Sequence, residues 1–161
     1  MSTITPEETV VSLLIEKNWH IAFAESCTAG LCCATLVNVA NASGVLDVSF
    51  TTYANEAKMQ YLGVSKASIE QYGVVSEQVA REMAAGVAKT AGAEVGVGVT
   101  GIAGPTGGSE KKPVGTVCFG FAVNGEVVTF TQRFGNLGRQ QVRQASVNFV
   151  FKTLTELLNK A

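Results

Sequence analysis

Residues 24–30, AESCTAG, place an acid, a hydroxyl, a thiol and a second hydroxyl side by side. Apolar residues precede and follow this segment, so a strand, a small polar turn and a helix are expected. Such a turn presents backbone N–H groups at a helix N-terminus, which favours an anion or a developing oxyanion. Ser26 is therefore a candidate nucleophile, and helix capping by Ser26 or Thr28 is the alternative role for these hydroxyls.

The chain contains one histidine, His20, only six residues before Ser26 at the start of the same expected strand. This placement disfavours a Ser-His-Asp triad, and lysine is the known alternative base for a serine nucleophile. FTTYANEAK (50–58) carries Tyr53 and Lys58, which a strand running into a helix can bring to one pocket. The pKa of a lysine base must fall from about 10.4 toward 7 or 8, which costs roughly 4 kcal/mol. A core Tyr53 and a solvent-exposed Lys58 form the alternative.

The segment TGIAGPTGGSEKKPVG (100–115) holds five glycines and two prolines and follows an apolar run. Glycine lets the backbone approach a ligand closely and present its N–H groups. The segment matches neither a Walker loop nor a G-x-G-x-x-G fingerprint. It is longer than most connections, and long ordered loops are often functional, so we expect a ligand-binding loop rather than a simple connector.

Composition limits the classes of function. The chain has 161 residues, 47% of them hydrophobic and 16% charged, and its net charge is −1. This length and composition fit one globular domain over 1–161. No basic surface is available for nucleic acid, and no apolar run approaches the ~20 residues of a membrane span. No segment resembles a secretory leader, so a cytoplasmic location is expected. The four cysteines lack a usual zinc spacing, so we expect no metal site, and Cys32, Cys33 and Cys118 are interpreted as buried apolar residues.

Turn and capping residues divide the chain into alternating elements. Helices are expected over 6–18, 28–41, 55–62, 65–72, 76–91 and 138–160, and strands over 21–24, 50–54, 95–101, 116–123 and 126–134. Asn124-Gly125 joins the last two strands and is typical of a type I′ hairpin. The pattern predicts an α/β fold: a three-layer α/β/α sandwich around a mixed, largely parallel sheet.

Four segments together resemble a known family: AESCTAG, FTTYANEAK, GVVSEQVAREMAAG and VTGIAGPTGGSEKKPVGTV. Their order and separations are similar to those of the C-terminal domain of the competence/damage-inducible protein CinA, over about residues 7–158. Stand-alone relatives of this domain are nicotinamide-nucleotide amidases of pyridine nucleotide salvage. The resemblance implies hydrolysis of nicotinamide mononucleotide to nicotinate mononucleotide and ammonia, without metal or cofactor. It also implies that Ser26, Tyr53 and Lys58 are the catalytic residues.

The resemblance further indicates which residues surround the substrate. Guanidinium groups bind phosphate bidentately, so Arg143 is a candidate for the substrate phosphate. We expect a small-molecule substrate, no nucleic-acid or membrane partner, and a homo-oligomer. The remaining expected pocket residues are Thr28, Ala29, Gly30, Thr100, Gly101, Gly107 and Gly108.

The sequence departs from the family pattern at three places. Ala29 replaces the first glycine of ESCTGG, where a positive φ would require glycine. Asn41-Ala42 lies in the stretch that usually reads P-G-S-S, and Gly138 stands where G-D-R-x-x-V-R has its acid. Two alternatives to an active serine amidase therefore stay open. One is a catalytically weak or silent relative that binds a pyridine nucleotide, and the other is a cysteine amidase that uses Cys27.

Overall fold

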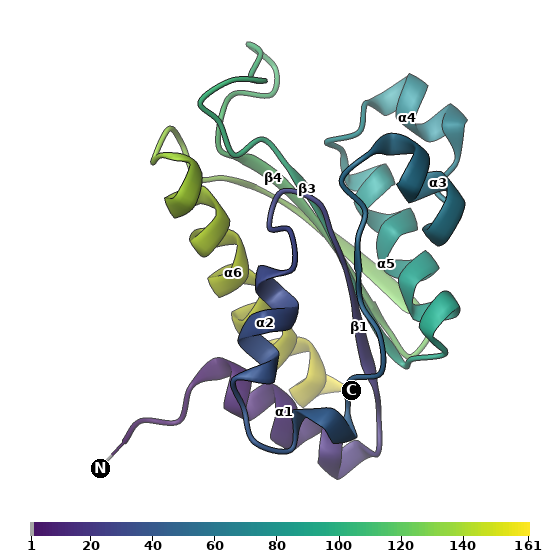
Figure 1. Ribbon diagram of the computed structural model, residues 1–161, viewed down its shortest axis with the longest axis vertical. Helices are drawn as coiled ribbons and strands as arrows, with labels where there is room; N and C mark the ends of the chain where they lie inside the picture. The colour runs from purple at the N-terminus through teal and green to yellow at the C-terminus, as the bar shows by residue number, and fades with distance from the viewer. Residues whose placement is uncertain (1) are drawn as a thin grey trace.

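The computed structural model describes residues 2–161, in which helices cover both faces of one sheet (Figure 1). The helices are α1 (Pro6–Lys17), α2 (Leu31–Val37), α3 (Asn55–Leu62), α4 (Lys66–Tyr72), α5 (Glu77–Ala91) and α6 (Arg139–Lys160), with a 3-10 helix η1 (Ala42–Gly44). The strands are β1 (Ile21–Glu25), β2 (Phe50–Thr51), β3 (Val95–Gly101), β4 (Thr116–Val123) and β5 (Glu126–Arg133).

The five strands are ordered β2-β1-β3-β4-β5. β1 pairs in parallel with β2 and β3, whereas β3–β4 and β4–β5 are antiparallel. The predicted mixed sheet in an α/β sandwich is confirmed, although parallel and antiparallel pairs are equally represented. At the turn between β4 and β5, Asn124 and Gly125 both have positive φ, as a type I′ hairpin requires.

The two faces of the sheet carry side chains of different size. Large side chains such as Phe23, Phe119 and Phe121 pack against α1, α2 and α6. The opposite face presents Ala22, Ala24 and several glycines to α5, with α3 and α4 packed beside that helix. Figure 1 shows these two helical groups on either side of the sheet. Because small residues line one face, α5 lies close to the strands.

Several predicted boundaries shift in the structure. The helix predicted over 28–41 is shorter, since α2 begins at Leu31 and ends at Val37 before a turn and η1. Only Phe50 and Thr51 of the predicted 50–54 strand pair with β1. Cys32 and Cys118 are buried as predicted, but Cys33 is only half-buried. No helix within residues 2–161 combines the length and apolar character needed to cross a membrane.

Candidate active site

Ser26 lies in a tight turn directly after β1. We call residues 26–30 the elbow. The Ser26 N–H donates to the carbonyl of Val99 at 3.0 Å, which fixes the start of the elbow against β3. Ala29 and Gly30 both adopt positive φ, 49° and 94°, and turn the chain into α2. The elbow therefore lies at the carboxyl ends of the parallel strands, where open α/β sheets bind ligands.

Neither hydroxyl of the elbow caps α2. Gly30 is the N-cap residue and provides no side-chain hydrogen bond, so the alternative role of Ser26 or Thr28 as a helix cap is excluded. The Glu25 carboxylate accepts the N–H groups of Cys32 at 2.8 Å and Cys33 at 3.0 Å instead. A carboxylate at this place stabilises the positive end of the helix dipole. Because the acid precedes the helix by several residues, local capping rules did not identify it.

Lys58 approaches Ser26 from α3. Its side chain is only 1% exposed, so the alternative of a solvent-exposed helix residue is excluded. Lys58 Nζ lies 3.3 Å from Ser26 Oγ, 2.7 Å from the carbonyl oxygen of Thr52 and 3.5 Å from that of Tyr53. Burial lowers the pKa of Lys58 from its ordinary value, since the charged form loses its hydration. A larger fraction of Lys58 is therefore neutral than in a solvent-exposed lysine.

These contacts orient the Lys58 amine. A neutral amine has two N–H donors and one lone pair. If the two carbonyl oxygens accept the N–H groups, the lone pair faces Ser26 Oγ and can accept its proton. The structure thus brings a lysine amine within hydrogen-bonding distance of the serine hydroxyl.

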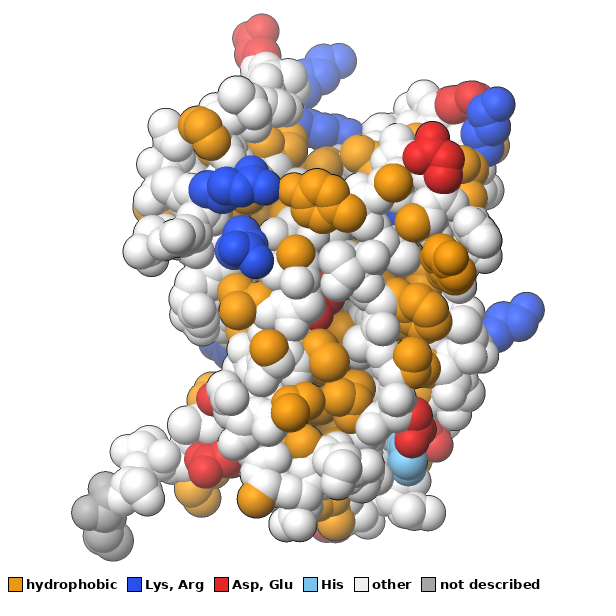
Figure 2. Space-filling model, viewed as in Figure 1, with side chains coloured by type: hydrophobic (Ala, Val, Ile, Leu, Met, Phe, Trp, Pro, Cys, Tyr) orange, Lys and Arg blue, Asp and Glu red, His pale blue; other side chains and the backbone are white. Residues whose placement is uncertain are grey.

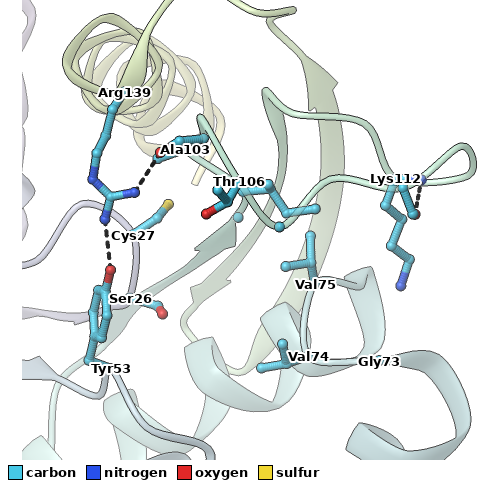
Figure 3. A pocket seen from close by; sticks show the side chains of 15 residues that line it. Ser26, Cys27, Tyr53, Gly73, Val74, Val75, Ala103, Thr106, Lys112 and Arg139 are labelled. Carbon is cyan, nitrogen blue, oxygen red and sulfur yellow. Dashed lines mark hydrogen bonds between the residues drawn. The ribbon is translucent and has the colours of Figure 1, made fainter.

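Tyr53, which the resemblance implies to be catalytic, lines the pocket. Its side chain is 59% exposed, which rules out a core role. The Tyr53 hydroxyl accepts a hydrogen bond from Arg139 Nη2 at 2.9 Å. Within residues 2–161 this hydroxyl makes no hydrogen bond to Ser26 or to Lys58. Figure 3 shows the Tyr53 ring beside Ser26, with its hydroxyl directed toward Arg139.

The pocket above Ser26 has a volume of about 430 Å³. Ser26, Cys27, Tyr53 and Arg139 lie along one side of it, and Val74, Val75, Thr106 and Lys112 lie opposite (Figure 3). The glycine-rich loop (102–115) forms much of the wall, as expected for a ligand-binding segment. In Figure 2, several Lys and Arg side chains lie at the end of the molecule where Figure 1 places this loop.

Of the residues expected at the substrate, the structure brings only some to the pocket surface. Ser26, Tyr53, Gly101 and Gly107 line the pocket, and Lys58 lies buried behind Ser26. The other expected residues, Thr28, Ala29, Gly30, Thr100, Gly108 and Arg143, are not part of its lining. Two of these have evident structural contacts. The Thr100 hydroxyl donates to the Val74 carbonyl at 2.9 Å, and Gly108 packs against Val114.

Arg143 is hydrogen-bonded to the backbone of the elbow. Its Nε donates to the Cys27 carbonyl at 2.9 Å and its Nη2 to the Thr28 carbonyl at 3.0 Å. Arg139, one helical turn earlier on α6, lines the pocket and donates through Nη1 to the Gly104 carbonyl at 2.7 Å. Arg139 was not among the residues predicted from the sequence, although its spacing of four residues from Arg143 places both on one face of α6.

Cys27 is a poor nucleophile in this setting. Its side chain is 5% exposed, and burial raises the pKa of the Cys27 thiol to about 11. Reactive thiols have a lowered pKa and partial exposure. The geometry and the pKa therefore favour Ser26 over Cys27. No cluster of His, Cys, Asp and Glu that could hold a metal ion occurs in the described residues 2–161.

Two of the three departures from the family pattern occupy left-handed backbone. Ala29 has φ 49° and Asn41 has φ 72°. Asparagine tolerates this conformation better than alanine, so the strain falls mainly on Ala29. The third departure, Gly138, precedes α6 with φ 98° and provides no side-chain cap. The Ser26–Lys58 contact is formed in spite of these changes.

The comparisons with known proteins match nearly the whole chain to one family. The CinA C-terminal domain family matches residues 3–158. The nicotinamide-nucleotide amidohydrolase PncC of Enterobacter agglomerans is 51% identical over 138 residues, which cover 85% of this chain and 84% of the relative. A putative competence-damage inducible protein of Clostridium perfringens is 45% identical over 158 residues. That match covers 98% of this chain and 38% of the relative, so the chain spans well under half of that longer protein.

Solved structures give the same result. The competence/damage inducible protein CihA of Agrobacterium tumefaciens superimposes with a TM-score of 0.90 at 39% identity, covering 99% of both chains. A competence-damaged protein (CinA) superfamily member from Klebsiella pneumoniae gives a TM-score of 0.91 at 31% identity, covering 98% of this chain and 99% of the other. The chain belongs to the CinA C-terminal domain family.

Proposed function

We propose that the chain is a nicotinamide-nucleotide amidase that hydrolyses nicotinamide mononucleotide to nicotinate mononucleotide and ammonia. The observation that carries the proposal is the buried Lys58, whose Nζ lies 3.3 Å from Ser26 Oγ beneath a pocket of nucleotide size. The 51% identity to the Enterobacter agglomerans relative, which is named for this amidohydrolase activity, supports the choice of substrate. Such a reaction belongs to pyridine nucleotide salvage. A cytoplasmic location and assembly into a homo-oligomer stay predictions.

The proposed reaction begins with proton transfer from Ser26 to neutral Lys58. Ser26 Oγ then attacks the carboxamide carbon, and the carbonyl oxygen becomes an oxyanion. The Lys58 proton is returned to the leaving nitrogen, so ammonia departs and a nicotinoyl ester remains on Ser26. Water, activated by Lys58 in turn, hydrolyses this ester and frees the carboxylate and the Ser26 hydroxyl.

Backbone groups of the elbow are the candidates for oxyanion stabilisation. The N–H groups of Cys27 and Thr28 donate to no backbone acceptor within residues 2–161. They follow the nucleophile directly, which is where serine hydrolases place such donors. The first N–H groups of α2 are not free for this role, because Glu25 accepts those of Cys32 and Cys33.

The pocket offers complementary surfaces to the rest of the nucleotide. Val74, Val75 and Ile102 form an apolar wall suited to a pyridine ring. Arg139 is solvent-exposed and lines the pocket, and its planar guanidinium suits a phosphate group. We therefore assign the phosphate to Arg139, with Lys112 as a second cation, and give Arg143 the role of holding the elbow.

The test is ammonia release from nicotinamide mononucleotide by three variants. Ser26→Ala should reduce kcat to background because it removes the nucleophile. Cys27→Ala should retain activity, since that thiol is buried and protonated. Ser68→Ala, on α4 and outside the pocket, serves as the matched control. Full activity of Ser26→Ala would reject the serine mechanism, and loss of activity in Cys27→Ala alone would select the cysteine amidase.

A second candidate function is nucleotide binding without turnover. It is favoured by the left-handed conformation of Ala29 beside the nucleophile, because backbone strain there can shift the elbow. Isothermal titration of the wild-type chain with nicotinamide mononucleotide distinguishes the two functions. Saturable binding with no ammonia released would select the binding protein, whereas turnover selects the amidase.

A further inference from the structure

We propose that Glu25 is a positioning residue, whose buried carboxylate fixes the elbow so that Ser26 faces Lys58. Glu25 is not itself placed to touch the substrate, since it is 1% exposed and is not part of the pocket lining. The inference rests on the proposed function in one respect: it assumes that Ser26 is the nucleophile. The sequence pattern assigns no role to Glu25, and the proposed reaction of Ser26 with Lys58 does not use its carboxylate.

The side chain of Glu25 links the residue before the elbow to the helix that follows it. Glu25 is the last residue of β1 and directly precedes Ser26. Its two carboxylate oxygens accept N–H groups seven and eight residues further along, at Cys32 and Cys33. The residue before the nucleophile is thereby tied to the first turn of α2. All five residues of the elbow lie within the loop that these two hydrogen bonds close.

The backbone of Glu25 reaches the base as well. Its carbonyl oxygen accepts the N–H of Thr52 at 2.9 Å, and the Thr52 carbonyl accepts Lys58 Nζ at 2.7 Å. Glu25 thus holds the elbow through its side chain, and through its main chain it contacts Thr52, whose carbonyl accepts the Lys58 amine. A shift of Glu25 would change the position of Ser26 relative to Lys58 from both directions.

The other capped helices show how unusual this arrangement is in the chain. Thr5 caps α1, Ser65 caps α4 and Ser76 caps α5, and each hydroxyl accepts the backbone N–H three residues ahead. Those caps need only a local turn. Glu25 spans a loop that contains the nucleophile and the strained Ala29, so its hydrogen bonds hold a conformation that the loop would not keep by itself.

The carboxylate of Glu25 also satisfies backbone donors that would otherwise be left without acceptors. Removing the carboxylate would leave the Cys32 and Cys33 N–H groups without acceptors in a region where Cys32 is fully buried. Unsatisfied buried donors are unfavourable, so the elbow would rearrange to satisfy them. A displacement of about 1 Å at a catalytic group can reduce the rate by about 100-fold.

The experiment measures how fast Ser26 reacts with a fluorophosphonate probe. The increase in the mass of the intact protein reports the extent of labelling. Ser26 Oγ replaces fluoride on phosphorus, and the hydroxyl proton leaves with the fluoride ion. This readout needs no natural substrate. Glu25→Gln keeps the shape and one acceptor oxygen, and should slow labelling about 10-fold, whereas Glu25→Ala should slow it about 100-fold. The ammonia assay should show a lowered kcat with KM nearly unchanged.

The matched control is Glu77→Gln. Glu77 lies in the first turn of α5, and its carboxylate accepts hydrogen bonds from Thr129 and Thr131 at 2.6 Å each, away from the catalytic pair. It should leave labelling within about twofold of the wild-type rate. Each variant is compared below its own Tm, so a loss of stability alone does not register as slow labelling.

The outcomes separate the two proposals. Folded Glu25 variants that label at the wild-type rate would overturn the positioning role and leave Glu25 as a helix cap only. A wild-type chain that labels at Ser26 but releases no ammonia would reject the proposed function, and labelling of the Glu25 variants would still test the positioning role. A wild-type chain that releases ammonia but fails to label at Ser26 would overturn the positioning role, because Ser26 would not be the nucleophile, and would leave the amidase function standing.

Discussion

Lys58 is a buried lysine without an acidic partner. Its Nζ contacts one hydroxyl and two carbonyl oxygens, and no carboxylate lies within salt-bridge distance of it in residues 2–161. A nearby carboxylate would favour the ammonium form and raise the pKa. Burial without such a partner has the opposite effect and lowers the pKa of Lys58. The site therefore has the electrostatic features that a lysine base requires.

The pH dependence of the reaction should follow Lys58. Because the proposed base is the neutral amine of Lys58, kcat/KM should rise with pH as Lys58 loses its proton, with an apparent pKa below the ordinary value of about 10.4. A pH–rate profile of ammonia release measures it. Lys58→Arg stays protonated throughout, so it should lower kcat by about 10²- to 10⁴-fold at every pH. A profile that falls as pH rises through this range would contradict the assignment.

Ala29 is the clearest source of strain in the elbow. An alanine at φ 49° is less favourable than glycine by about 1 kcal/mol, because its Cβ approaches the following carbonyl oxygen. Ala29→Gly should therefore raise the free energy of unfolding by about 1 kcal/mol in urea denaturation. The side chain is exposed, so no packing is lost. Asn41→Gly, at a residue that tolerates the same conformation, should change the stability less.

Single residues of the site were predictable to different degrees. The pairing of Ser26 with Lys58, which the structure shows as a contact, was expected because their side-chain chemistry is distinctive and the only histidine is badly placed. Glu25 and Arg139 were not, because their roles depend on contacts with residues seven and 35 positions away or more. The direction of the Tyr53 side chain was not predictable either, and its hydroxyl accepts a hydrogen bond from Arg139.

At the scale of elements, the packing of α3 against α5 determines where Lys58 lies. Gly86 of α5 faces the last residue of α3, and an added Cβ would overlap the carbonyl oxygen of Leu62. The two helices approach closely because position 86 has no side chain. Since α3 also carries Lys58, this contact links helix packing to the position of the Lys58 amine.

Gly86→Ala should push α3 away from α5. We expect a loss of about 1–3 kcal/mol in the free energy of unfolding, as for overpacked cores, together with a lower kcat because Lys58 moves with α3. Urea denaturation and the ammonia assay measure the two effects. Gly44→Ala is the matched control, since an added Cβ there meets nothing within 4 Å. Unchanged activity in a destabilised Gly86→Ala would show that α3 does not move.

Elements with local signals were predicted well. α1 and α5 begin where Thr5 and Ser76 predict, because each cap is a neighbouring side chain. The β4–β5 hairpin follows from Asn124-Gly125 for the same reason. The start of α2 was misplaced because its cap comes from β1, and β2 was overestimated because its pairing with β1 ends after two residues.

At the scale of the whole molecule, the pocket joins segments that are far apart in the sequence. The elbow, Tyr53, the glycine-rich loop and Arg139 meet at one end of the sheet. Each segment follows or precedes a different element, so a ligand that contacts all of them should stabilise the folded chain as a unit.

Ligand binding should therefore raise Tm. In Ser26→Ala, which cannot turn over the substrate, nicotinamide mononucleotide at 100 times Kd should stabilise the fold by about 2.7 kcal/mol. For a chain of this size the shift amounts to about 5–10 °C in a thermal melt. Adding Arg139→Ala to this variant should abolish most of the shift at the same concentration, because the phosphate loses its guanidinium partner. An equal shift in both proteins would contradict the assigned phosphate site.

The carboxyl terminus lies at the other end of the molecule. Lys17 Nζ donates to the carbonyl oxygen of Ala161 at 2.8 Å, beside the end of α1, and Figure 1 shows this carboxyl end of the chain well away from the glycine-rich loop. A protein attached through its carboxyl end to a solid support would keep its pocket mouth facing the solution. The same geometry suits surface-based biosensors, in which the captured chain must admit small ligands while its anchor stays out of their path.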